Sequence, residues 1–196
     1  MIGTLSPIAL AILVMLSCST FSSSAMAKVT MTSQQEALSN LEKTLPPADS
    51  KERFFKLSQV AAAAYDAGDY DKAQAYANEL LSDANQYQGN WNYGNAIFYG
   101  NLMLGRVALK RDNNTSAAES YLLAAGRTPG SPQLNSFGPN MILAQDLLKQ
   151  GERDVVLDFI DEWGKFWKAD NGRLSEWKNS IDQNETPNFA PNLSYF

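Results

Sequence analysis

Three tight turns, each flanked by helical patterns of small and apolar residues, constrain the fold of this chain more than any other feature. The turns are centred on Gly68, Asp112 and Gly151, so they lie 44 and 39 residues apart. On both sides of each turn, apolar residues recur at intervals of three and four, the spacing that buries one face of an α-helix. No run of four or more alternating β-branched residues appears anywhere in the sequence, so strands are not expected. We therefore predict an all-α fold built from helical hairpins.

The residues at these positions resemble tetratricopeptide-repeat (TPR) helix pairs, in which small residues let the two helices of a pair approach closely. The pairs are Leu57, Val60, Ala61 and Ala64 with Ala73, Ala77 and Leu80; Leu104, Gly105 and Ala108 with Ala117, Tyr121 and Ala124; and Leu143, Ala144 and Leu147 with Val156, Ile160 and Trp163. The resemblance implies a TPR-like helical-hairpin solenoid of about three repeats over residues 51–185. The string TPGSPQLNSFGPNM also resembles an uncharacterised bacterial family of TPR-like proteins, and this second resemblance implies the fold alone.

Residues 28–50 are expected to form an N-terminal helix and a linker before the repeats. The helix is predicted over residues 33–45, because the Pro46–Pro47 pair that follows cannot continue it. Asp49 or Ser50 is of the residue type that caps the start of the next helix.

Two segments toward the C-terminus are predicted to be non-helical. Residues 128–140 hold three prolines and read as a structured loop in which Pro139 opens the next helix. Residues 186–196 contain two prolines and form an apolar tail that either docks back onto the helices or is presented to a partner. Between them lies an aromatic group that we expect to cover the C-terminal end of the array as buried core. Its members are Trp163, Phe166, Trp167 and Trp177.

Residues 1–27 are typical of a secretory signal peptide. Residues 8–16 form an unbroken apolar run, and Ala25 and Ala27 are the small residues of a cleavage site. The run is shorter than the roughly 20 residues that a membrane span needs. Cleavage after Ala27 would make the protein periplasmic or secreted. The alternative is a lipoprotein anchored at Cys18, because the residues before Cys18 resemble a lipobox.

Composition disfavours several functional classes. The chain has 16 Lys and Arg residues against 21 Asp and Glu residues, and its net charge of -5 repels nucleic acid. With no His and a single Cys, it offers no disulfide, no Cys or His zinc site and no triad with a His base. An acidic run reads as a solvated helix face rather than a catalytic pair or a calcium loop. The run is Asp154, Asp158, Asp161 and Glu162. We expect a protein that is not an enzyme and that uses no metal or cofactor.

Cations on the first helix of successive hairpins predict a binding groove. The helical register turns Arg106, Lys110 and Lys149 away from the second helices, where three exposed charges could hold a carboxylate or an acidic peptide. The alternative is a solvated surface, with Lys110 placed at a helix C-terminus that favours cations anyway. The complete predicted groove is Tyr65, Tyr99, Arg106, Lys110, Gln145 and Lys149. Ser58 and Ala62 stand where chaperone-binding TPR domains carry Lys and Asn, so a chaperone-tail clamp is disfavoured.

An aromatic connector over residues 86–99 is the second candidate surface. Trp91 and Tyr93 lie there among Asn and Gly residues, and rings beside amides can stack on and hydrogen-bond to a sugar or a peptide. These rings could equally pack against the neighbouring hairpin. The sequence therefore predicts a scaffold for a protein or peptide partner, with binding of an envelope glycan or small ligand by Trp91 and Tyr93 as the alternative.

Overall fold

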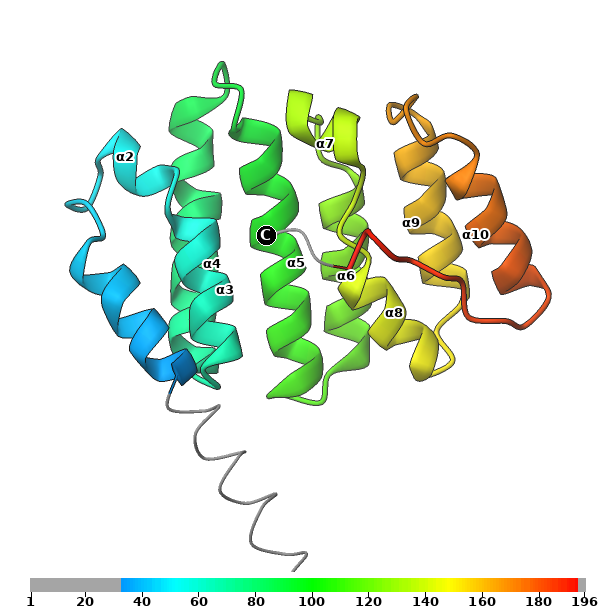
Figure 1. Ribbon diagram of the computed structural model, residues 1–196, viewed down its shortest axis with the longest axis horizontal. Helices are drawn as coiled ribbons and strands as arrows, with labels where there is room; N and C mark the ends of the chain where they lie inside the picture. Colours follow the sequence, from blue (N-terminus) through cyan, green and yellow to red (C-terminus); the bar gives the residue numbers. More distant parts are fainter. Residues whose placement is uncertain (1–32, 194–196) are drawn as a thin grey trace, which may run out of the picture.

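The structure is a computed structural model that describes residues 33–193 of the chain (Figure 1). Within this span it contains helices and loops and no strand, which confirms the predicted all-α class. No helix of the described span is long and apolar enough to cross a bilayer. The predicted signal peptide over residues 1–27, with Cys18, and residues 194–196 of the tail lie outside the described residues.

The helices begin and end close to the predicted positions. The first covers residues 33–43, so it ends two residues earlier than expected. Ser50 caps the second, as predicted, by accepting a hydrogen bond from the Arg53 backbone N–H. The elements that follow residue 43 are α2 (Lys51–Phe54), α3 (Leu57–Asp66), α4 (Tyr70–Ala84), the 3₁₀ helix η1 (Asn85–Tyr87), α5 (Tyr93–Lys110), α6 (Thr115–Gly126), α7 (Pro132–Phe137), α8 (Ile142–Lys149), α9 (Asp154–Gly164) and α10 (Arg173–Asp182).

Most of these helices form a row in which neighbours run antiparallel. From α3 to α6 each helix packs on the next one in sequence, and α9 and α10 continue the row beyond α6 (Figure 1). Small residues allow the close approach: Ala64, Ala73 and Ala77 are fully buried between α3 and α4. A Cβ atom on Gly105 would lie 2.4 Å from Leu143 Cδ2, so a larger residue has no room there. The predicted small-residue crossings are therefore observed.

The third hairpin departs from the pattern of the first two. In the row, α9 rather than α8 packs beside α6, and a Cβ atom on Gly126 would lie 2.9 Å from Phe159 Cδ2 of α9. The short α8 lies across the row instead and contacts α5, α6 and α9. The prediction that Pro139 opens a helix is wrong, because α8 begins at Ile142. Pro132 opens α7 in its place, one residue after the capping Ser131.

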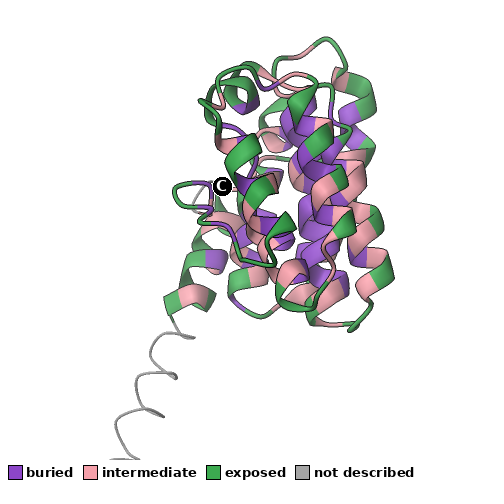
Figure 2. Ribbon diagram, turned by 90° about the vertical axis from the view of Figure 1, so that its right-hand side faces the viewer, coloured by how far each residue is buried: buried purple, intermediate pink, exposed green. Residues whose placement is uncertain are grey.

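The C-terminal end of the row is closed by buried aromatic residues, as predicted. Trp163, Trp167 and Trp177 are at most 2% exposed. The rings form a chain in which Trp163 meets Trp167 edge-on at 6.2 Å between centroids and Phe189 of the tail meets Trp177 at 5.3 Å. The described part of the tail therefore docks on the helices of its own chain. Figure 2, which views the row from its C-terminal end, shows buried residues on the inner faces of the helices.

Candidate functional site

A cavity of about 250 Å³ lies between α3, α5 and α8. Its lining combines aromatic, basic and acidic side chains. They are Tyr65, Arg106, Leu109, Lys110, Asp146, Lys149 and Gln150. Four of the six predicted groove residues thus meet around one cavity, although they come from three helices spread over the sequence. We call this cavity the cationic pocket.

Arg106 forms the fixed part of the cationic pocket. Its side chain is 9% exposed, and its guanidinium carbon lies 3.9 Å from the centroid of the Tyr65 ring, a cation–π contact. The expectation that Arg106 is an exposed cation is wrong, because the ring of α3 covers the face of α5 on which it lies. Burial raises the pKa of the Tyr65 hydroxyl, and the charge of Arg106 partly offsets that rise.

Lys110 and Lys149 form the exposed rim of the same pocket. The Lys149 ammonium donates to Asp146 Oδ1 at 2.8 Å and lies 3.4 Å from Gln145 Oε1. Gln145 therefore adjoins the pocket through Lys149 without lining it. Three cations face one carboxylate at this place, in a protein whose net charge is -5. The local excess of positive charge favours an anionic ligand.

Tyr99 does not belong with the rest of the predicted groove. It lies on α5 two and three turns before the pocket residues, but its ring packs against the core and meets the Phe98 ring at 5.0 Å. Burial raises the pKa of Tyr99 to about 12. The helical register identified the correct side of α5, yet it could not show that neighbouring elements cover this part of it.

The aromatic connector presents one ring to solvent rather than two. Trp91 is 57% exposed and stacks on Phe55 with 5.5 Å between centroids and 15° between planes. Tyr93 packs against the buried cluster around Phe54 and Leu57. Sequence reasoning missed Phe55 because nothing local pairs it with a connector that follows some 30 residues later. The adjacent Phe54–Phe55 pair was the available signal that one ring is buried and the other is presented.

A buried polar network fixes the loop around α7 against the start of α5. The Asn95 amide, 3% exposed, donates to Gln133 Oε1 at 2.9 Å, and the Ser131 hydroxyl donates to Asn95 Oδ1 at 2.5 Å. The Thr128 hydroxyl donates to the Gly94 carbonyl at 2.7 Å. Each of these buried polar groups is satisfied, so the network holds the two segments in one arrangement.

Two residues of the predicted acidic run form ion pairs at the surface, as expected for a solvated helix face. Asp161 pairs with Lys178 and Glu162 pairs with Lys165. Asp154 and Asp158 line an open cavity of about 510 Å³ beside Glu119. Burial, followed by the neighbouring Glu152 carboxylate, raises the pKa of Glu119. Among residues 33–193 no group of three or more ligating side chains is arranged to hold a metal ion.

Comparison of the chain with protein-family models, with curated proteins and with solved structures finds no match in any of the three. The structure defines the chain as an all-helical protein with packed helices and a small pocket rich in positive charge. A function for it has to be argued from that pocket and from the surface around it.

Proposed function

We propose that this chain is an exported, non-catalytic TPR-like scaffold that binds an acidic peptide segment of a partner protein in the cationic pocket. One observation carries the proposal. Arg106, Lys110 and Lys149 come together from two helices, beside Tyr65 of a third, on a protein with an excess of negative charge. A cluster of positive charge on a protein whose net charge is negative favours an anionic ligand at that cluster.

The dimensions of the pocket favour one acidic side chain over a whole small molecule. Its volume of about 250 Å³ lies below the roughly 300–1,000 Å³ of cavities that hold drug-sized ligands. A Glu or Asp side chain fits such a volume, while the rest of a peptide runs over the exposed surface. Leu109 provides an apolar wall against which the stem of that side chain can pack.

The cationic pocket contains one fixed cation, Arg106, and two exposed cations, Lys110 and Lys149. Arg106 is held against Tyr65, so it loses little side-chain freedom when it binds a carboxylate. Lys110 and Lys149 are exposed and adjust to the ligand. Asp146 holds Lys149 in the free protein, and an incoming carboxylate competes for that ammonium group. Replacing Asp146 should therefore strengthen binding.

The TPR-like reading is supported by where the pocket lies. The first helices of the three predicted hairpins, α3, α5 and α8, each contribute to it, and the predicted groove of a TPR-like array is lined by such helices. The oblique α8 narrows the groove to a pocket. The alternative proposal of glycan binding at the aromatic connector has support from the exposed Trp91, while Tyr93 is half-buried against the cluster around Phe54 and Leu57.

Export is proposed from the sequence alone, from the apolar run over residues 8–16 and the small residues Ala25 and Ala27. Intact mass of the protein from the cell envelope distinguishes the two forms of this proposal. A chain that begins at Lys28 supports cleavage after Ala27, whereas a diacylated chain that begins at Cys18 supports the lipoprotein. An unprocessed chain in the cytosol would contradict both.

Titration with a fluorescently labelled peptide rich in Glu tests the proposed binding. We expect saturable binding that weakens between low and physiological salt, and no binding of the same peptide with Gln in place of Glu. Lys110→Glu combined with Lys149→Glu should weaken binding by about tenfold or more. Lys56→Glu with Lys168→Glu changes the net charge equally at a distance from the pocket and should leave the affinity within about twofold, as expected for screened charges. Equal losses in both variants would contradict a specific pocket.

A further inference from the structure

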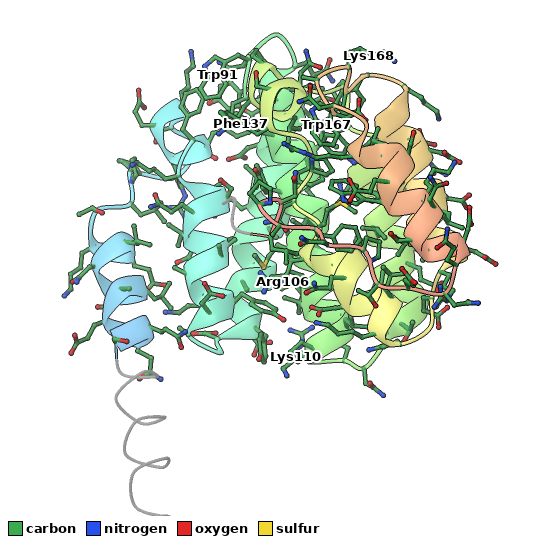
Figure 3. The ribbon with its side chains drawn as sticks, turned by 45° about the vertical axis from the view of Figure 1, so that its right-hand side comes forward. Trp91, Arg106, Lys110, Phe137, Trp167 and Lys168 are labelled. Atoms are coloured by element: carbon green, nitrogen blue, oxygen red, sulfur yellow. The ribbon has the colours of Figure 1, made fainter. Side chains whose placement is uncertain are left out.

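The two large apolar side chains that the described surface exposes most lie at the same end of the helix row. Trp91 is 57% exposed and Phe137 is 53% exposed. Figure 3 shows both of them, with Lys168, at one end of the helices and Lys110 at the other. We call the first end the aromatic end. It consists of residues 44–56, 85–92, 127–138 and 165–172, which the alternating helix directions bring together.

Charge distinguishes the aromatic end from the rest of the molecule. Its four segments hold six cations and three anions, although the whole chain has a net charge of -5. The connecting loops at the opposite end, residues 67–69, 111–114, 150–153 and 183–188, hold two cations and four anions. Glu79 and Glu162, on neighbouring helices, pair with three of these six cations, namely Arg53, Arg127 and Lys165. The other three are available to a ligand. Lys51, Lys56 and Lys168 are exposed and form no ion pair within residues 33–193.

The exposed rings are held at fixed positions rather than on mobile loops. Trp91 stacks on Phe55, whose neighbour Phe54 is fully buried. Phe137 is the last residue of α7, which the Asn95–Ser131–Gln133 hydrogen bonds tie to the first turn of α5. A Cβ atom on Gly94 would lie 1.8 Å from the Gly130 carbonyl oxygen, so the two segments touch backbone to backbone. The structure therefore exposes two large rings at one end that are already fixed, so they lose little conformational freedom on binding.

We infer that the aromatic end docks on the surface of a bilayer that contains anionic lipid. Rings of this kind insert at the level of the lipid headgroups, and lysines around them contact the phosphates. Trp91 and Phe137 supply the rings. Charge comes from Lys168, which lies at the same end in Figure 3, and from the exposed Lys56, which follows Phe55 in the sequence. Docking through this end leaves the cationic pocket on the flank of the row, open to a peptide. This inference stands independently of the peptide-binding proposal, because the two sites share no residue.

Tryptophan fluorescence reports docking at this end specifically. Trp163, Trp167 and Trp177 are at most 2% exposed, so a change in emission on adding vesicles comes from Trp91. With the full chain, we expect a blue shift with vesicles of phosphatidylcholine and phosphatidylglycerol in a 3:1 mixture, and none with phosphatidylcholine alone. The shift should decrease as salt is added. Lipids brominated in the upper acyl chain should quench the emission of the docked protein.

Co-sedimentation with the same vesicles compares variants. Trp91→Ala with Phe137→Ala should lower the partition coefficient by about tenfold or more, because two apolar side chains no longer leave water. Lys56→Glu with Lys168→Glu should lower it by at least about 25-fold, since the loss of each basic residue near an anionic surface costs about fivefold and the new carboxylates add repulsion. Lys110→Glu with Lys149→Glu is the matched control and should leave the partition coefficient within about twofold. Circular dichroism verifies that every variant keeps its helical content.

Three outcomes would overturn the inference. Sedimentation without a shift in Trp91 emission would assign membrane binding to another segment, such as the apolar run over residues 8–16. A shift with soluble glycans but not with anionic vesicles would identify the aromatic end as a glycan surface. Equal binding to neutral and anionic vesicles would show that the lysines take no part.

Discussion

The two ends of the helix row are closed by different kinds of interaction. At the N-terminal end, the helix over residues 33–43 buries Leu38, and its Glu42 accepts hydrogen bonds from Lys72 Nζ at 3.0 Å and from the Tyr76 hydroxyl at 2.8 Å. At the C-terminal end, tryptophans pack edge to face with Phe189 of the tail. A row of helices leaves an apolar face at each end that must be covered. The comparison shows that the N-terminal face combines leucine packing with the polar contacts of Glu42, whereas large rings dominate the C-terminal face.

This difference predicts that the C-terminal closure contributes more stability and that the N-terminal closure responds more to pH and salt. Burial of large rings contributes several kcal/mol per side chain whatever the solution conditions. Exposed ion pairs contribute about 0–1 kcal/mol, and salt screens them. The predictions below test the comparison from the largest expected effect to the smallest.

Trp163→Ala should have the largest effect, lowering the free energy of unfolding by about 3–5 kcal/mol. The ring is fully buried and contacts the rings of Phe98, Phe159 and Trp167, so its loss leaves a cavity at the C-terminal closure. Urea denaturation followed by circular dichroism measures the change. Trp91→Ala, which removes an exposed ring, should cost less than about 1 kcal/mol and serves as the control. Equal effects of the two substitutions would contradict the assigned core.

Gly105→Leu should cost about 1–3 kcal/mol at the middle of the row. A Cβ atom there already lies 2.4 Å from Leu143 Cδ2 and 3.1 Å from Tyr121 Cβ, so both α6 and α8 would have to move. Gly164→Leu is the matched control: Gly164 ends α9, and nothing lies within 4 Å of its Cβ position. Thermal melting that is unchanged in Gly105→Leu would contradict the packing of α5.

Tyr76 makes the N-terminal closure sensitive to alkaline pH. Burial and then the hydrogen bond to Glu42 raise the pKa of Tyr76 to about 12 from its usual 10.0. Because the folded-state pKa is the higher one, the stabilisation is fully present below pH 10 and is lost as pH rises toward 12. Wild-type melting temperature should therefore fall across this window. Tyr76→Phe should reduce the fall and leave the part that Tyr65 and Tyr99 contribute, because their pKa values are also raised. A fall as steep as that of the wild type would contradict the role of Tyr76.

Glu42→Gln should have the smallest effect, about 1 kcal/mol or less, because Lys72 and Glu42 are partly exposed. The hydrogen bond from Lys72 lowers the pKa of Glu42. Its stabilisation is therefore present above the usual carboxyl pKa and is lost as pH falls through the lowered value. Denaturation at low and high salt should show a difference between Glu42→Gln and the wild type that shrinks as salt rises. A difference above about 2 kcal/mol would contradict the assignment of the Glu42 contacts as weak, partly exposed interactions.

The C-terminal closure could be predicted from the sequence better than the N-terminal one, and the reason is physical. Trp163, Trp167 and Trp177 are large apolar residues at the C-terminal end of the predicted repeats, and the need to cover the last face of the array identified them as core. The Glu42 contacts join residues 30 and 34 positions apart. Such pairing depends on how helices cross, which periodicity does not determine.

The same limit applies to the candidate site. Helical register correctly assigned Tyr65, Lys110 and Lys149 to one side of the row, because residues three and four apart share a helix face. It failed for Arg106 and Tyr99, whose exposure depends on elements packed against that face. Sequence analysis also did not predict the helix α7 or the position of α8 across the row. Ser131 before Pro132 is a typical helix start, but the prediction placed both residues in the loop over residues 128–140.

A charge-swap experiment tests the central claim, that the cationic pocket selects acidic peptides, most directly. The affinity of two labelled peptides, one rich in Glu and the other with Lys at the same positions, is measured for the wild type and for Lys110→Glu combined with Lys149→Glu. The account predicts that the wild type prefers the Glu peptide and that the variant loses this preference or reverses it, since both exposed charges of the rim change sign. A variant that binds the Glu peptide as tightly as the wild type does would contradict the account.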